Sequence, residues 1–180
     1  MTYIFLAPGF EEIEALCPLD LLRRAGVEVK TVGIGGKSVA GSHGITVEAD
    51  MADIDFSDPE PDLIVLPGGM PGTLNLQASP VVMNAIKNTA KGDAYIGAIC
   101  AAPMILGKLG LLRNKKATCY PGFEEYLEDA DVLEVPAVID GKIITGAGMG
   151  AALDFGLLLV SVLCGEDKAA ELRHSVIADR

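Results

Sequence analysis

The sequence predicts an α/β fold, with a mostly parallel β-sheet covered by helices on both faces, in a single domain over residues 1–180. Short apolar runs alternate along the chain with amphipathic segments, and strands that alternate with helices form parallel sheets of this kind. Half of the 180 residues are apolar, and the chain contains no linker or repeat. A chain of this size and composition suits one domain with a substantial core.

Four apolar runs have the length and composition of buried strands. Residues 3–7 (YIFLA) stop at Pro8-Gly9, and residues 62–66 (DLIVL) stop at Pro67-Gly68-Gly69. Proline and glycine in such pairs end strands in turns. The expected strands are residues 3–7, 27–32, 62–66 and 94–99.

Five segments predict helices. The first, residues 11–25, has acids in its first turn, Arg23 and Arg24 in its last and Gly26 beyond it, which suits the helix dipole and a glycine cap. The others are residues 81–90, 102–109, 151–164 and 168–178. We also expect a small hairpin over residues 33–48 and a second over 135–145, where Asp140-Gly141 separates two apolar runs.

The composition excludes several classes of partner. Lys and Arg number 14 against 25 Asp and Glu, a net charge of −11, and aromatic residues are 5%. Phosphate backbones and anionic membranes attract basic surfaces, so we expect no nucleic acid and no membrane partner. The first residues lack the positive segment of a signal peptide, which favours the cytoplasm.

Cysteine and histidine spacing gives no sign of a bound metal. The four cysteines are widely spaced without a CxxC pair, and the two histidines, His43 and His174, form no cluster. We therefore expect free thiols, no metal site and no cofactor. Gly146, Gly148 and Ala151 fit G-x-G-x-x-A, but too few residues follow for a dinucleotide site.

The strongest chemical signal is Cys100. A buried strand leads directly into it, and the small residues Ala101 and Ala102 follow, as at a nucleophile elbow. The N-terminus of the following helix should favour the thiolate and lower the thiol pKa. The alternative is that Cys100 is one more small buried hydrophobe.

Glu14 and two glycines are the other candidates at the same edge of the sheet. Glu14 shares a helical face with Pro18 and Leu21, so its carboxyl group could be buried, protonated and hydrogen-bonded to the thiolate; the alternative is a solvated glutamate. Gly68 and Gly69 follow a strand and could supply backbone N–H groups to an oxyanion, or form a plain turn.

Together these segments resemble the ThiJ/PfpI superfamily, in the branch of the Parkinsonism-associated protein deglycase. The matching segments are residues 9–14 (GFEEIE), 23–26 (RRAG), 66–69 (LPGG), 98–103 (AICAAP) and the glycine-rich stretch near Gly146, in the family's order. The resemblance implies a flavodoxin-like three-layer sandwich and a homodimer. It also implies that Cys100 is a reactive nucleophile, that Glu14 is its protonated partner, and that Gly69 and Ala101 line an anion pocket.

Two positions depart from the family's pattern. The peptidase-like branch has His directly after the nucleophile, where this chain has Ala101, so a cysteine peptidase is disfavoured. The deglycase branch often has His where this chain has Tyr120, preceded by Cys119. Tyr120 and Cys119 could shape the pocket, and His43 could supply an imidazole to the site of a partner chain.

The resemblance implies a cofactor-free enzyme that acts on small reactive carbonyls such as methylglyoxal or its adducts. It would be a lyase or hydrolase of the glyoxalase III or deglycase type. The alternative is an oxidative-stress sensor or redox-regulated chaperone in which Cys100 is oxidised to a sulfinic acid. The same Cys100–Glu14 pair serves both hypotheses, so the sequence leaves them open.

Overall fold

A computed structural model describes residues 1–57 and 60–179 of the chain. Among these residues, seven strands form the central sheet: β1 (Thr2–Leu6), β2 (Val29–Gly33), β5 (Met51–Ala52), β6 (Leu63–Leu66), β7 (Tyr95–Ile99), β10 (Ala137–Asp140) and β11 (Ile143–Gly146). Their order is β10-β11-β7-β6-β1-β2-β5. Every neighbouring pair is parallel except β10 with β11, which form the antiparallel hairpin that Asp140-Gly141 predicts.

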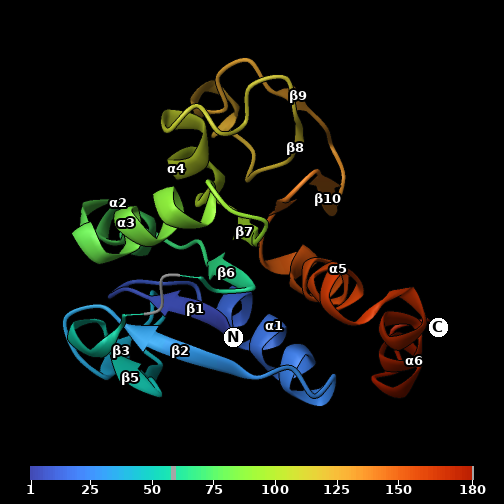
Figure 1. Ribbon diagram of the computed structural model, residues 1–180, viewed down its shortest axis with the longest axis horizontal. Coiled ribbons are helices and arrows are strands. Elements are labelled where there is room, and N and C mark those ends of the chain that lie inside the picture. The colour runs from blue at the N-terminus through green and yellow to red at the C-terminus, as the bar shows by residue number, and fades with distance from the viewer. Residues whose placement is uncertain (58–59, 180) are drawn as a thin grey trace.

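Helices cover both faces of the sheet. One face carries α1 (Glu12–Arg24), α5 (Ala152–Cys164) and α6 (Glu166–Ser175), and the other carries α2 (Gly72–Ala78), α3 (Pro80–Thr89) and α4 (Pro103–Lys108) (Figure 1). The predicted α/β fold, a flavodoxin-like three-layer sandwich, is confirmed.

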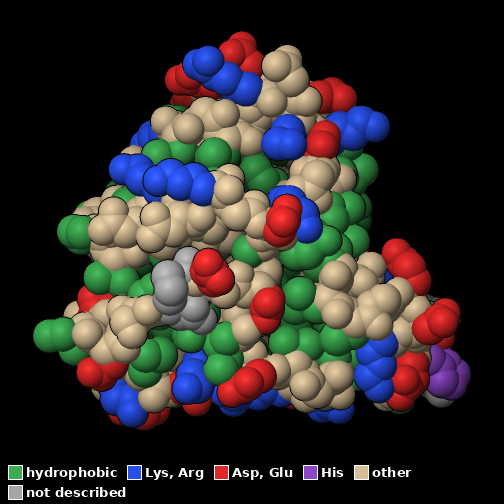
Figure 2. Space-filling model, in the orientation of Figure 1, with side chains coloured by type: hydrophobic (Ala, Val, Ile, Leu, Met, Phe, Trp, Pro, Cys, Tyr) green, Lys and Arg blue, Asp and Glu red, His purple; other side chains and the backbone are tan. Residues whose placement is uncertain are grey.

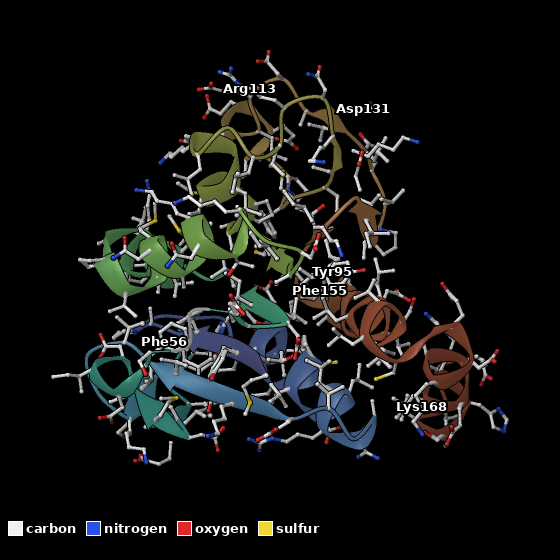
Figure 3. The ribbon with its side chains drawn as sticks, in the orientation of Figure 1. Phe56, Tyr95, Arg113, Asp131, Phe155 and Lys168 are labelled. Atoms are coloured by element: carbon white, nitrogen blue, oxygen red, sulfur yellow. The ribbon has the colours of Figure 1, made fainter. Side chains whose placement is uncertain are left out.

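Each face of the sheet has its own hydrophobic core. All five residues of β1 are buried, and its apolar side chains alternate between the two cores. Phe5 packs on the side of α2, α3 and α4, whereas Ile4 and Leu6 pack on the side of α1 and α5. Phe56, labelled in Figure 3, extends the first core, with its ring edge-on to Tyr3 and Phe5 at centroid distances of 4.9 and 5.2 Å. Burial on both faces is why these strands read as continuous apolar runs.

Short elements complete the described fold. The predicted small hairpin is present as β3 (Ser38–Ala40) paired antiparallel with β4 (Thr46–Glu48). A second pair is parallel, β8 (Lys116–Ala117) with β9 (Asp131–Val132). Three 3₁₀ turns are η1 (Asp53–Asp55), η2 (Glu124–Tyr126) and η3 (Met149–Ala151). The sequence did not predict α2, β5, β8 or β9.

The surface is mixed in charge on the face drawn in Figure 2, where acidic and basic side chains are interspersed. In the part of the chain that the structure describes, every helix is too short or too polar to cross a bilayer.

Candidate active site

The candidate residues meet beyond the carboxyl ends of β1, β6, β7 and β11, the edge of a parallel sheet where ligands bind. Cys100 follows β7 directly, Gly68 and Gly69 follow β6, and Glu14 lies in the first turn of α1, after β1. The structure places the Glu14 carboxyl group and the Cys100 side chain together against Gly68, close enough that each group shifts the pKa of the other. Two residues that are 86 positions apart in the sequence therefore form one polar pair.

Cys100 has a strained backbone that neighbouring strands hold in place. Its φ angle is +66°, in the left-handed region, which costs a residue with a side chain about 1–3 kcal/mol. The Cys100 N–H donates to the carbonyl of Gly146 at 2.9 Å, and its carbonyl accepts from the Tyr120 N–H at 2.9 Å. These two bonds fix the turn, and the side chain remains partly accessible to solvent.

Glu14 is buried, with 1% of its surface exposed. Its Oε2 atom accepts a hydrogen bond of 2.9 Å from the backbone N–H of Gly68. A Cβ atom at Gly68 would lie 2.5 Å from Glu14 Oε2 and 2.6 Å from Cys100 Cβ, closer than real Cβ contacts. Glycine at position 68 is therefore what lets the strand end, the acid and the thiol approach one another.

The two ionisable groups perturb each other. Burial raises the pKa of Glu14 to about 7, although the hydrogen bond from Cys100 opposes the change. Burial and the neighbouring charge of Glu14 raise the pKa of the Cys100 thiol to about 12, and the backbone N–H groups of Gly69 and Ala101 act in the opposite direction. The expectation that the helix lowers the thiol pKa is wrong for this geometry, because burial of the thiol and the neighbouring charge of Glu14 outweigh the backbone N–H groups that favour the thiolate.

The pair titrates as a unit, so its first proton leaves near neutral pH and its second only at high pH. The single negative charge that results can reside on the sulfur or on the carboxylate. The N–H groups of Gly69 and Ala101 stabilise it on the sulfur, whereas the N–H of Gly68 stabilises it on Glu14. The N–H of Gly68 thus donates to the Glu14 carboxyl group. This corrects the prediction that Gly68 lines the anion pocket together with Gly69 and Ala101.

Tyr120 and Cys119 are adjacent in the chain but lie in different surroundings. Tyr120 is half exposed, and a Cβ atom at Gly148 would lie 3.2 Å from its ring and 3.9 Å from Glu14 Oε1. The ring therefore borders the acid across Gly148. Cys119 is 6% exposed and packs in the core beneath α2, α3 and α4, where burial raises its pKa to about 11.

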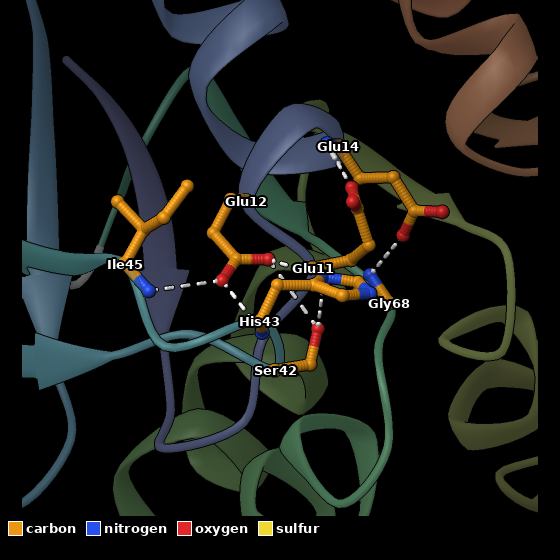
Figure 4. A network of polar contacts seen from close by, with 7 residues as sticks. All are labelled: Glu11, Glu12, Glu14, Ser42, His43, Ile45 and Gly68. Atoms are coloured by element: carbon orange, nitrogen blue, oxygen red, sulfur yellow. Dashed lines mark hydrogen bonds and ion pairs between the residues drawn. The ribbon is translucent and has the colours of Figure 1, made fainter.

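His43 lies on the exposed turn between β3 and β4. Its Nδ1 atom is 2.9 Å from Oε2 of the buried Glu12, and the hydrogen bond to this carboxylate raises the pKa of the imidazole (Figure 4). Within one chain the polar partners of His43 are therefore Glu12 and Ser42. Its contribution to the site of a second chain stays a prediction.

One group among the described residues has ligand atoms spaced closely enough for a metal ion. Atoms of Glu11, Glu12 and His43 lie within 4.8 Å of one another. Both carboxylate oxygens of Glu12 already accept hydrogen bonds, from His43, Ser42 and Ile45 (Figure 4). The geometry is that of an acid that anchors the turn over residues 42–45.

The segments that contain Glu11, Glu12 and Gly148 were expected at this edge of the sheet, but the sequence assigned these three residues no contact with the Cys100–Glu14 pair. Glu11 accepts a hydrogen bond from the N–H of Glu14, three residues later, which is the spacing of a helix cap and was readable from the sequence. The burial of Glu12 depends on the β3–β4 turn and had no local signal. Gly148 was noted, but as part of a dinucleotide pattern.

Comparisons with known proteins agree with this geometry. Residues 2–162 match the DJ-1/PfpI family. The chain is 39% identical to Protein DJ-1 homolog B of Arabidopsis thaliana, over 96% of this chain and 40% of that protein, so it spans less than half of that relative. It is 32% identical to the glutathione-independent glyoxalase DJR-1.2 of Caenorhabditis elegans, over 90% of this chain and 87% of that protein.

A solved structure supports the same assignment. The structure of Toxoplasma gondii DJ-1 in an oxidised form superposes with a TM-score of 0.90 at 31% identity, and covers 98% of this chain and 97% of that one. Sequence, fold and the arrangement of the strand ends point the same way, and the chain belongs to the DJ-1/PfpI family.

Proposed function

We propose that this protein is a cofactor-free enzyme that converts small 2-oxoaldehydes, such as methylglyoxal, to 2-hydroxy acids. The observation that carries the proposal is the contact between the Cys100 thiol and a buried Glu14 whose pKa is raised to about 7. A group that exchanges a proton near neutral pH is suited to general acid–base catalysis. The glyoxalase name of the Caenorhabditis elegans relative supports the same reaction class.

The first step would be attack of the Cys100 sulfur on the aldehyde carbon. A C–S bond forms, the carbonyl π electrons move to oxygen, and that oxygen takes a proton to give a hemithioacetal. The backbone N–H groups of Gly69 and Ala101, which face the sulfur, would stabilise the developing oxyanion.

Glu14 would then move a proton between the two substrate carbons. Its carboxylate removes the proton from the former aldehyde carbon to give an enediol, and returns it to the adjacent carbon to leave a thioester. Water hydrolyses the thioester, which releases the hydroxy acid and regenerates the thiol. The net change is the addition of one water to the 2-oxoaldehyde, so no electron carrier is needed.

Turnover of methylglyoxal by matched variants tests this mechanism. We expect proton NMR to show lactate formation by the wild type and a loss of about 100-fold or more for Cys100→Ser and Glu14→Gln. Cys119→Ser removes another thiol and serves as the control, since Cys119 lies in the core. Equal turnover by the wild type and by Cys100→Ser would refute the proposal.

A redox sensor is the second candidate, because the same two N–H groups and a protonated Glu14 could hold the oxygens of a sulfinate. Two peroxide molecules would oxidise the thiol to a sulfinic acid and release two waters. Mass spectrometry after mild peroxide treatment should then find two added oxygens on Cys100 selectively. Equal oxidation of all four cysteines would count against a sensor.

His43 enters the proposal as an imidazole supplied by a partner chain in a homodimer. The hydrogen bond to Glu12 raises its pKa, which would suit it to donate a proton. The activity of His43→Ala should therefore depend differently on pH from that of the wild type. An unchanged profile would remove His43 from the mechanism.

A further inference from the structure

Glu11 contacts the candidate site through both its side chain and its backbone. Its Oε2 atom accepts a hydrogen bond of 2.7 Å from the backbone N–H of Glu14. Its own N–H donates to the carbonyl oxygen of Gly68 at 2.9 Å. The N–H of Gly68 in turn donates to Glu14 Oε2 at 2.9 Å. Glu11, Glu14 and Gly68 are thus joined in a closed ring of three hydrogen bonds, whose side-chain members are drawn in Figure 4.

This ring restricts the acid at both of its ends. One bond fixes the backbone of Glu14 at the start of α1, and another fixes its carboxyl group against the end of β6. The third bond ties Glu11, the residue that caps α1, to the turn after β6, so these two segments cannot separate without breaking the ring. A catalytic group whose position is set by surrounding hydrogen bonds needs little reorganisation during the reaction.

We propose that Glu11 is a positioning residue that holds the carboxyl group of Glu14 against the sulfur of Cys100. Its catalytic consequence rests on the proposed function, whereas its effect on the thiol does not. The negative charge of Glu11 adds to this role because it disfavours ionisation of Glu14. Among the causes that raise the pKa of Glu14, burial is the largest and the charge of Glu11 is the second.

Three variants distinguish the effect of the hydrogen-bonded ring from the effect of the negative charge of Glu11. Glu11→Gln keeps an oxygen that can accept from the Glu14 N–H but removes the charge. Glu11→Ala removes both. Glu12→Gln is the matched control, since it removes a negative charge from the next residue in the chain. The Glu12 carboxylate contacts the turn over residues 42–45.

The readout is the rate of Cys100 alkylation by iodoacetamide against pH, followed by mass spectrometry of the peptide. We expect the profile of Glu11→Gln to move to lower pH by about half a unit, because one neighbouring negative charge no longer opposes the anion of the pair. Glu11→Ala should depart further from the wild-type profile than Glu11→Gln does, because it loses the hydrogen bond to the Glu14 N–H as well as the charge, and it should also have a lower melting temperature, from the lost helix cap. Glu12→Gln should keep the wild-type profile.

The outcomes distinguish this proposal from the proposed function. If Glu11 is only a helix cap, Glu11→Gln restores the melting temperature and leaves the alkylation profile at its wild-type position, which overturns the proposal. A shift of the same size in Glu12→Gln would also overturn it. If the wild type does not turn over methylglyoxal, the proposed function fails, but the alkylation profile still decides the role of Glu11. If turnover is present, Glu11→Ala should lower kcat with little change in KM.

Discussion

Glu14→Gln should change how the stability of the protein depends on pH. The pKa of Glu14 rises from 4.5 to about 7 on folding, chiefly by burial, so the folded state binds this proton more tightly than the unfolded state does. Between these two pH values the native chain holds a proton that the unfolded chain has lost, and stability therefore falls as pH rises. Glutamine cannot titrate, and its amide keeps an oxygen for the Gly68 N–H.

The size of the effect follows from the shift in pKa. The difference between 7 and 4.5 is 2.5 units. At about 1.36 kcal/mol per unit, the wild type should lose about 3 kcal/mol of stability from this group as pH rises through the interval. No reduction for solvent screening applies, because only 1% of the Glu14 surface is exposed. The stability of Glu14→Gln relative to the wild type should rise by the same amount.

Urea denaturation at several pH values, from below 4.5 to above 7, measures this difference, because the other titrating groups are common to both proteins. Cys100→Ala is the comparison variant: it removes the hydrogen bond that opposes the pKa shift but leaves the carboxyl group buried, so its stability should depend on pH at least as strongly as that of the wild type. Parallel stability curves for the wild type and Glu14→Gln would show that the acid titrates alike in the folded and unfolded states, which would contradict a Glu14 pKa raised by burial.

Two further predictions concern glycines that allow a close approach. Gly68→Ala places a Cβ 2.5 Å from Glu14 Oε2, so we expect a loss of about 2 kcal/mol and a melting temperature lower by about 4–8 °C in calorimetry; an unchanged melting temperature would contradict this geometry. Gly107→Ala meets the backbone oxygen of Tyr126 at 2.0 Å and should cost about 3 kcal/mol or more, whereas Gly92→Ala, with its nearest atom at 3.8 Å, should stay within about 0.5 kcal/mol; similar losses for both would contradict the packing.

The fold could be predicted because its main elements follow local rules. The strands that lie between two helical layers are apolar throughout, and α1 has acids at its start and basic residues at its end. The expected strand at residues 62–66 and the observed β6 (Leu63–Leu66) differ by one residue. The hairpin at Asp140-Gly141 was equally clear, because few turns other than hairpin turns favour that pair.

The elements that escaped prediction lack such patterns. Helix α2 begins at Gly72, next to Pro71, and contains Asn75 and Gln77, so its sequence is typical of a turn. Its packing beside the end of β1 makes it helical, and this contact is not local in sequence. Strands β5, β8 and β9 have two residues each, too few for any alternation to be visible.

At the site, the sequence indicated which residues could meet but not how they bond. Cys100, Glu14 and the two glycines follow strands of one parallel sheet, and such strand ends share an edge. The partner of each N–H depends on the rotation of single peptide units at Gly68 and Gly69, which composition does not determine. The direction of the thiol pKa shift depends on burial and on the charge of an acid that is distant in sequence.

Two features of the site oppose the stability of the fold, and neither is needed to build the sheet. Cys100 holds a φ of +66°, and Glu14 is buried without belonging to any ion pair found among the described residues. Strain and buried acids persist where the surrounding structure enforces them, and they gather at functional sites. Cys119 shows the contrast, since it is a buried thiol packed in a core, whereas Cys100 lies beside the buried carboxyl group of Glu14. Reactivity should therefore follow the position of Cys100 beside Glu14 and not the mere presence of a buried thiol.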